Sequence, residues 1–217
     1  MKRKMKIAML LVVMLSIGML SATFALFHQN TELKENVFTA SSGLSISLRE
    51  PSWDGYDFDD KVPGIPGTQK NPESKDTSLG IDLAQQYMPG DHIKKDPTLK
   101  NEQGSENAWV AIKVEFYNHD GTLISQEQFE KEYGMITIND KFTLIEANTK
   151  YSLYAYNDIL KAGDKSEALF NEVVVNEDIA FVKGGLPSFK VKTSGYAVQS
   201  KGVNKEKALK QFKTMMN

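Results

Sequence analysis

The chain has 217 residues, of which 41% are hydrophobic and 25% are charged, and its formal net charge is −2 at pH 7. This length suits one domain with a sizeable core, and the small net charge excludes the basic field that nucleic-acid binding requires. There is no cysteine, which excludes disulfides, thiolate metal sites and thiol catalysis. Any stability outside the cell must therefore come from packing.

The N-terminal stretch has the layout of a secretory signal peptide. The first six residues carry four positive charges, which come from Lys2, Arg3, Lys4 and Lys6. An uncharged apolar run follows them, and small side chains follow that run, as is typical of such a signal. Thr23 and Ala25 occupy positions −3 and −1 of a cut before Leu26. We therefore predict a signal peptide at residues 1–25 and a mature chain of residues 26–217.

The alternative interpretation of the same stretch is a retained membrane anchor. Residues 7–27 contain no charged side chain, and about 20 apolar residues are enough to span a bilayer. Cleavage would release everything downstream, whereas an anchor would hold the chain at the membrane.

The next stretch combines a predicted strand with a predicted loop. Leu44, Ile46 and Leu48 alternate with serines, which predicts a strand with one buried face. Residues 51–78 hold four prolines and a group of acids without apolar periodicity. We predict that these residues form a long surface loop.

The clearest strand prediction lies in the middle of the chain, at residues 108–117. Apolar residues occupy every second position there, from Ala108 through Val110, Ile112 and Val114 to Phe116. Strict alternation over ten residues indicates a strand with a buried face. Further strands are predicted within residues 142–147, 151–157, 172–179 and 189–199.

Three short helical segments are also predicted. Ser125 with Gln128 three residues later forms a capping-box pattern, which indicates a short helix. Residues 162–171 are predicted to contain a turn and a single helical turn, with Asp164 and Glu167 in capping positions.

Residues 204–216 are predicted to form a C-terminal amphipathic helix. Asn204 is its cap, and Ala208, Leu209 and Phe212 are predicted to face inward. Many short strands with turn signals and few helices predict a mainly β fold, an antiparallel β-sandwich.

The sequence offers little that resembles an active site. Its three histidines are far apart and form no HExxH motif, and no GxSxG, P-loop or GxGxxG motif occurs. We therefore predict no catalytic residue and no cofactor. The weak metal candidates are the loop acids Asp54, Asp57, Asp59 and Asp60, whose oxygens are of the kind that binds calcium. The alternative is a solvated acidic loop.

The stretch after the apolar run resembles the processing region of a known family. The sequence "SATFALFHQNTELKENVFTASSGLSISL" is similar to that of the TasA/camelysin (CalY) family of Gram-positive bacterial surface and biofilm-matrix proteins, which carry SipW-type signal peptides. The matching residues are Thr23, Ala25, Phe27, Asn36, Phe38, Gly43 and Leu44.

Three later segments resemble the same family, in the same order. One is the turn-and-strand unit "PGDHIKKDP", which continues to Asn101. The others are "ILKAGDKSEALFNEVVV" and "VKTSGYAVQSKGV", the last with Ser194 where alanine is common. Together the four segments cover most of the chain beyond residue 20, apart from residues 51–78.

The resemblance implies a secreted or cell-surface structural protein with a jelly-roll-like β-sandwich. It implies release by a SipW-like signal peptidase, and self-association or association with other matrix proteins in a fibre or extracellular matrix. Some family members assemble by donor-strand exchange, in which a freed N-terminal segment completes a neighbour's sheet. The donor here would run from Leu26 to about Ala40. Its apolar contacts would come from Leu26, Phe27, Leu33, Val37 and Phe38.

Several alternatives stand beside this expectation. Residues 26–40 could pair within their own chain as the first strand of the sandwich. The protein could be a camelysin-like surface metallopeptidase, or a minor pilin-like adhesin that binds a partner through residues 51–78. In each case we expect no nucleic-acid partner and a membrane contact only through the uncleaved signal segment.

Overall fold

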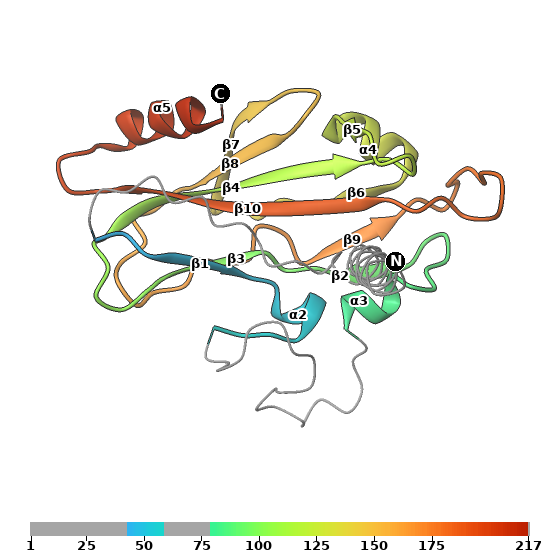
Figure 1. Cartoon of the computed structure of the whole chain (residues 1–217), viewed down its shortest axis with the longest axis horizontal. Coiled ribbons are helices and arrows are strands. Elements are labelled where there is room, and N and C mark those ends of the chain that lie inside the picture. Colours follow the sequence, from blue (N-terminus) through green and yellow to red (C-terminus); the bar gives the residue numbers. More distant parts are fainter. Residues whose placement is uncertain (1–42, 59–78, 217) are drawn as a thin grey trace, which may run out of the picture. The chain divides into compact units, whose positions relative to one another are not determined.

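A computed structural model describes residues 43–58 and 79–216 of the chain (Figure 1). All of these residues belong to one structural unit, Lys34–Asn217. The predicted signal peptide, its cleavage site and most of the predicted 51–78 loop lie outside the described residues.

The described residues form a mainly β structure with few short helices and a helix at the C-terminus, as the sequence predicts. The strands are β1 (Ile46–Arg49), β2 (His92–Lys94), β3 (Thr98–Asn101), β4 (Ala108–Tyr117), β5 (Leu123–Ile124), β6 (Gly134–Ile136), β7 (Phe142–Ala147), β8 (Ser152–Tyr156), β9 (Glu172–Val175) and β10 (Lys190–Gln199). The helices are α2 (Pro51–Asp54), α3 (Gly80–Leu83), α4 (Gln126–Glu132) and α5 (Lys205–Met215).

The strands form three antiparallel sheets. The larger sheet has the order β10-β4-β8-β7, with β5 beside β4, and the smaller sheets have the orders β1-β3 and β2-β9-β6. Strands β10 and β4 pair over ten residues each, from Lys190 opposite Tyr117 to Gln199 opposite Ala108. This pairing is the longest of the described ladders.

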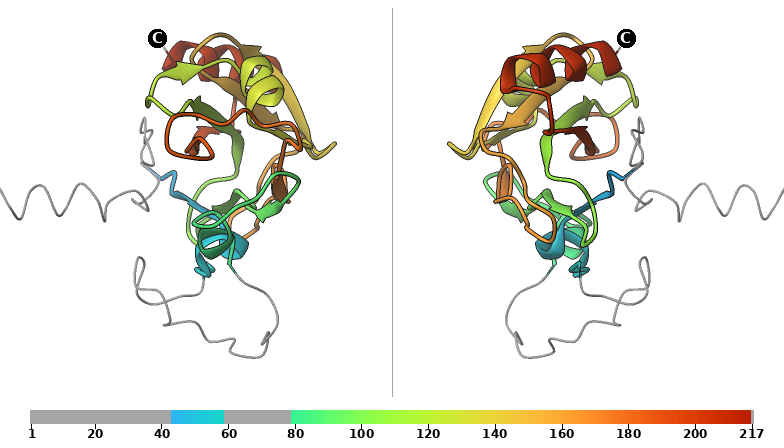
Figure 2. Two further views of the ribbon diagram at one scale, coloured as in Figure 1. Left: turned by 90° about the vertical axis from the view of Figure 1, so that its right-hand side faces the viewer. Right: turned by 90° about the vertical axis from the view of Figure 1, so that its left-hand side faces the viewer.

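Two apolar clusters lie on opposite faces of the larger sheet. The inter-sheet core fills the space between the larger sheet and the smaller ones, and it includes Ile46, Leu99 and Ile112. The helix-side core lies between the larger sheet and α5, and it includes Tyr196 and Phe212. Figure 2 shows α5 over the larger sheet and β1 on the other side of that sheet.

Local sequence signals explain where the main helices begin. The Ser125 hydroxyl accepts the backbone N–H of Gln128 at 3.1 Å, which caps α4. The Asn204 side chain accepts the backbone N–H of Lys207 at 2.9 Å, which caps α5. Such caps satisfy backbone donors that have no partner within the helix. Both predicted caps are confirmed.

The predicted helical turn within residues 162–171 is wrong. The segment instead lies beside β3, where it exchanges backbone hydrogen bonds with the strand. Asp164 accepts the N–H of Asn101 at 3.0 Å, and the N–H of Ser166 donates to Leu99 at 2.8 Å. Partners on a neighbouring strand therefore override the local capping pattern.

The beginning of the predicted surface loop contains a helical turn, α2. Pro51 lies at the start of this helix, where its missing N–H costs nothing. Gly55 ends the helix at φ 78°, a left-handed conformation that favours glycine. The sequence pattern predicted only a loop here and not this helical turn.

The two layers approach each other closely at Gly195 of β10. A β-carbon at this position would lie 2.6 Å from Leu99 Cδ2 and 3.6 Å from Ile46 Cδ1. Leu99 and Ile46 both belong to the inter-sheet core, so little space is open to an added methyl group at Gly195.

We predict that Gly195→Ala lowers the free energy of unfolding by about 1–3 kcal/mol, because an added methyl group overpacks the core. Urea unfolding of the purified chain measures this change. Adding Leu99→Val should make the loss smaller than the sum of the two single effects. Simple additivity would show that Gly195 and Leu99 do not compete for the same space.

Candidate functional site

The outer edge of β10 is a row of backbone groups beside which no described strand lies. The N–H of Ser200 donates to Asn107 just beyond the β10–β4 ladder. Bonded and non-bonded pairs alternate in an antiparallel ladder, so alternate residues of β10 direct their N–H and C=O away from β4. These residues include Val191, Thr193, Gly195 and Ala197. No other described strand pairs with them.

The opposite edge of the larger sheet is built differently. Among the described strands, β7 pairs only with β8, and its register shifts between Leu144 and Glu146. This irregularity leaves Ile145 without an opposite residue. A bulge in an edge strand hinders the addition of another strand. The β10 ladder has no register shift over its ten residues, so β10 lacks this protection.

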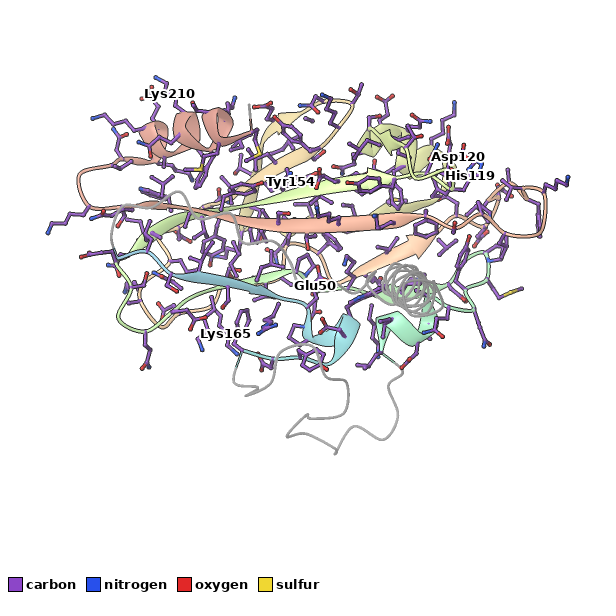
Figure 3. The ribbon with its side chains drawn as sticks, viewed as in Figure 1. Glu50, His119, Asp120, Tyr154, Lys165 and Lys210 are labelled. Carbon is purple, nitrogen blue, oxygen red and sulfur yellow. The ribbon has the colours of Figure 1, made fainter. Side chains whose placement is uncertain are left out.

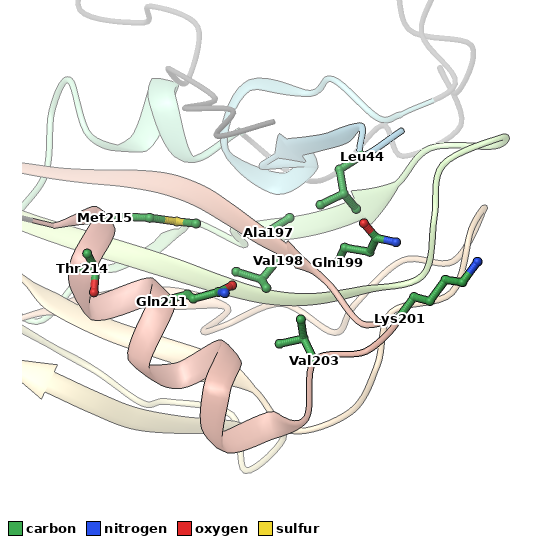
Figure 4. A pocket seen from close by; sticks show the side chains of 9 residues that line it. All are labelled: Leu44, Ala197, Val198, Gln199, Lys201, Val203, Gln211, Thr214 and Met215. Atoms are coloured by element: carbon green, nitrogen blue, oxygen red, sulfur yellow. The ribbon is translucent and has the colours of Figure 1, made fainter. Parts of the chain in front are cut away.

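A groove of about 580 Å³ adjoins the end of the β10 edge. The residues that line it are Leu44, Ala197, Val198, Gln199, Lys201, Val203, Gln211, Thr214 and Met215. Figure 4 shows Leu44, which precedes β1, and Met215, from α5, on either side of β10. Apolar side chains predominate, with Lys201 as the charged residue of the lining. This edge and groove together are called the β10 acceptor surface below.

A buried cluster of charged and polar groups connects β10 to the start of α2. The Lys95 Nζ lies 2.8 Å from Glu50 Oε2, and Thr193 Oγ1 donates to Glu50 Oε1 at 2.5 Å. Glu50 is 2% exposed and Lys95 is 6% exposed. Figure 3 marks Glu50 just before α2. The three residues are far apart in the sequence, so no local motif indicates the cluster.

Neighbouring groups surround this ion pair. The Lys95 ammonium lies 4.8 Å from the centre of the Trp53 ring, which attracts a cation. The Asp96 carboxylate accepts the N–H of Ser52 at 2.8 Å and its hydroxyl at 2.9 Å. Burial raises the pKa of Asp96, the Ser52 hydrogen bonds lower it, and the charge of Glu50 raises it further. The net direction is upward.

This arrangement is suited to holding elements together. It joins the segment after β1 to the connection between β2 and β3 and to the middle of β10. A buried ion pair adds little net stability, because the cost of desolvating both charges offsets their attraction, whereas one partner alone is strongly destabilising. The cluster therefore fixes α2 against the sheets.

The acidic metal candidates do not form a site in the described part of the chain. Asp54 accepts the N–H of Tyr56 at 3.0 Å, and Asp57 is 2.9 Å from the ammonium of Lys165. Burial raises the pKa of Asp57, but the bonds from Lys165 and the Phe58 N–H outweigh it and lower the pKa overall. Asp59 and Asp60 lie outside the described residues.

The described histidines lie apart. His92 on β2 is 3.0 Å from Glu172, and His119, after β4, lies 3.2 Å from the hydroxyl of Tyr133. Among residues 43–58 and 79–216, no group of three metal-binding side chains comes together.

The remaining predicted site residues lie outside the described residues. They are the cleavage residues Thr23, Ala25 and Leu26, and the assembly residues Leu26, Phe27, Leu33, Val37 and Phe38. In the described part of the chain, no helix is long and apolar enough to cross a bilayer.

Comparisons with known proteins add no assignment. No family model matches the chain, and no curated protein or solved structure gives a significant match.

We predict that Glu50→Ala lowers the free energy of unfolding by about 3–5 kcal/mol, because it leaves the Lys95 ammonium buried without its carboxylate. Urea unfolding checks this value. The double variant Glu50→Leu/Lys95→Met should recover most of the loss, since it removes both charges. As a matched control, Glu206→Ala breaks the exposed pair with Lys210 and should leave stability nearly unchanged. Equal effects of Glu50→Ala and Glu206→Ala would contradict a structural role for the buried pair.

Proposed function

We propose that this protein is a secreted or cell-surface structural protein that polymerises, of the kind found in bacterial biofilm matrix and fibres. The observation that carries the proposal is the β10 acceptor surface: an edge without a bulge beside an apolar groove. Exposed edge strands are templates for pairing with another chain, and natural proteins usually block them. No described strand blocks the outward groups of β10, which favours a binding role for this edge.

The partner that best fits this edge is an extended segment of another copy of the same chain. Strand addition gives affinity through main-chain hydrogen bonds and specificity through side-chain pockets. Residues 26–40 supply a mature N-terminal segment with apolar side chains at Leu26, Phe27, Leu33, Val37 and Phe38. Such a segment would give the outward N–H and C=O groups of β10 partners, and some of its apolar side chains would enter the groove.

Cleavage of the leader would control this assembly. As long as residues 1–25 hold the segment in a membrane, the segment cannot reach the acceptor surface of a neighbour. A SipW-like signal peptidase is the proposed processing partner, and the released protein would reside in the extracellular matrix or on the cell surface. The proposed role is structural and needs no catalytic residue or cofactor. Other matrix proteins with a similar donor segment are further candidate partners.

Two observations on secreted protein test the proposal together. Mass spectrometry of the N-terminus should find Leu26 as the first residue, and electron microscopy should find ordered assemblies. Full-length chain confined to membranes, with no assembled material outside the cells, would refute the proposal.

We predict that Ala25→Leu blocks processing, because a signal peptidase accepts only small side chains at this position. The uncleaved chain should remain with the membrane fraction and form no assemblies. Immunoblotting of membrane and medium fractions measures this. Ala22→Leu is the matched control, since Ala22 lies outside positions −1 and −3 and should be processed normally. Normal release of the Ala25→Leu chain would place the cut elsewhere.

We predict that Ala197→Pro abolishes self-assembly with the fold retained. Proline removes the N–H that points away from β4, so the β10–β4 ladder keeps its bonds while the outer edge loses a donor. Sedimentation measures assembly, and circular dichroism measures folding.

The matched control lies on the other edge of the sheet. The N–H of Asn157 donates to Lys141, so alternation directs the backbone of Leu144 away from β8. Leu144→Pro should therefore remove an equivalent outward N–H and leave assembly intact. Equal loss of assembly in Leu144→Pro and Ala197→Pro would contradict a specific role for β10.

A further inference from the structure

The residues that line the groove at the edge of β10 come from both faces of the larger sheet. Leu44 and Ala197 pack against the inter-sheet core. Val203 and Met215 pack against the helix-side core. The two pairs of side chains therefore belong to opposite sides of the same strand, and Figure 4 shows them around the end of β10.

This placement sets a requirement on the sequence of any strand that binds there. Successive side chains of a strand point to opposite faces of its sheet. A strand added beside Ala197 would direct one residue toward Leu44 and the next residue toward Val203 and Met215. Both directions are apolar, so the groove favours two apolar residues in succession over the alternating pattern of an ordinary surface strand.

The N-terminal segment contains two such pairs between residue 26 and the first described residue. They are Leu26–Phe27 and Val37–Phe38, whereas Leu33 lies between Glu32 and Lys34. After the proposed cleavage Leu26 carries the charged α-amino group. Placing that charged group in an apolar groove would remove its hydration without supplying a new hydrogen-bond partner. Val37–Phe38 has no such charge, and it lies within a continuous chain that can pair on both sides.

We infer that the groove is the binding site for the Val37–Phe38 pair of a second copy, with one of the two side chains on each face of the larger sheet. This inference rests on the proposed function and adds the part of the donor that is recognised. Volume agrees with it, because a groove of about 580 Å³ has room for both side chains. Lys201 at the groove adds charge complementarity, since Glu35 lies two residues before Val37.

The cysteine-free sequence allows a direct cross-linking test in the secreted full-length mature protein. Donor variants Val37→Cys and Phe38→Cys are each mixed with acceptor variants Leu44→Cys and Val203→Cys, and are then oxidised mildly. We expect disulfide-linked heterodimers in which one donor position links to Leu44→Cys and the adjacent donor position links to Val203→Cys. Phe27→Cys and Thr149→Cys are the donor and acceptor controls and should link at background level.

The outcomes separate this inference from the proposed function. Cross-linking through Phe27→Cys in chains that still assemble would overturn the Val37–Phe38 assignment and leave the proposed function standing. The double variant Phe38→Cys/Val203→Cys tests pairing within one chain. If its disulfide forms only within a single chain, the groove binds the N-terminal segment of the same chain, and the inference is overturned. Absence of both assembly and cross-links would overturn the proposed function as well.

A second measurement needs no introduced cysteine. Phe38→Ser should weaken assembly about ten- to hundredfold, the effect expected for losing the burial of one phenylalanine side chain. Phe27→Ser should weaken assembly less than Phe38→Ser does, because Phe27 lies outside the pair that enters the groove. Critical concentrations from sedimentation give both values, and the reverse order of effects would contradict the inference.

Discussion

The ten-residue pairing of β10 with β4 is the contact on which the rest of the structure depends. Both strands contribute side chains to the inter-sheet core and to the helix-side core. At Gly195 the absence of a side chain lets Leu99 of β3 pack directly against β10. One edge of β10 is used completely by this ladder, and the other edge meets no described strand. The same strand thus organises the fold and provides the acceptor surface.

Polar groups inside the protein contribute to the position of this strand. Thr193 on β10 bonds to Glu50, which also pairs with Lys95. The buried pair is more suited to fixing one arrangement than to adding net stability. Because the chain has no cysteine, packing and such buried pairs take the place of covalent links. The acceptor edge is consequently held by groups that are distant in the sequence.

Much of the fold was accessible from local patterns. Strict alternation predicted β4 from Ala108 to Tyr117, and capping residues predicted the starts of α4 and α5. The helical turn predicted at residues 162–171 failed, because backbone partners on β3 are invisible to local capping rules. For the same reason, neither the Glu50–Lys95 pair nor the groove was predicted. Both join residues from remote parts of the chain, such as Leu44 and Met215, and only tertiary packing brings these together.

Hydrogen–deuterium exchange at the outward amides of β10 tests the central claim most directly. The amides of the partly exposed residues Val191 and Ala197 should exchange rapidly in the unassembled mature protein and slowly in the assembled form, because only a donor strand supplies their acceptors. The amides that bond to β4, such as that of Tyr196, should be protected in both forms. Protection of the outward amides before assembly, or their continued rapid exchange after it, would contradict this account.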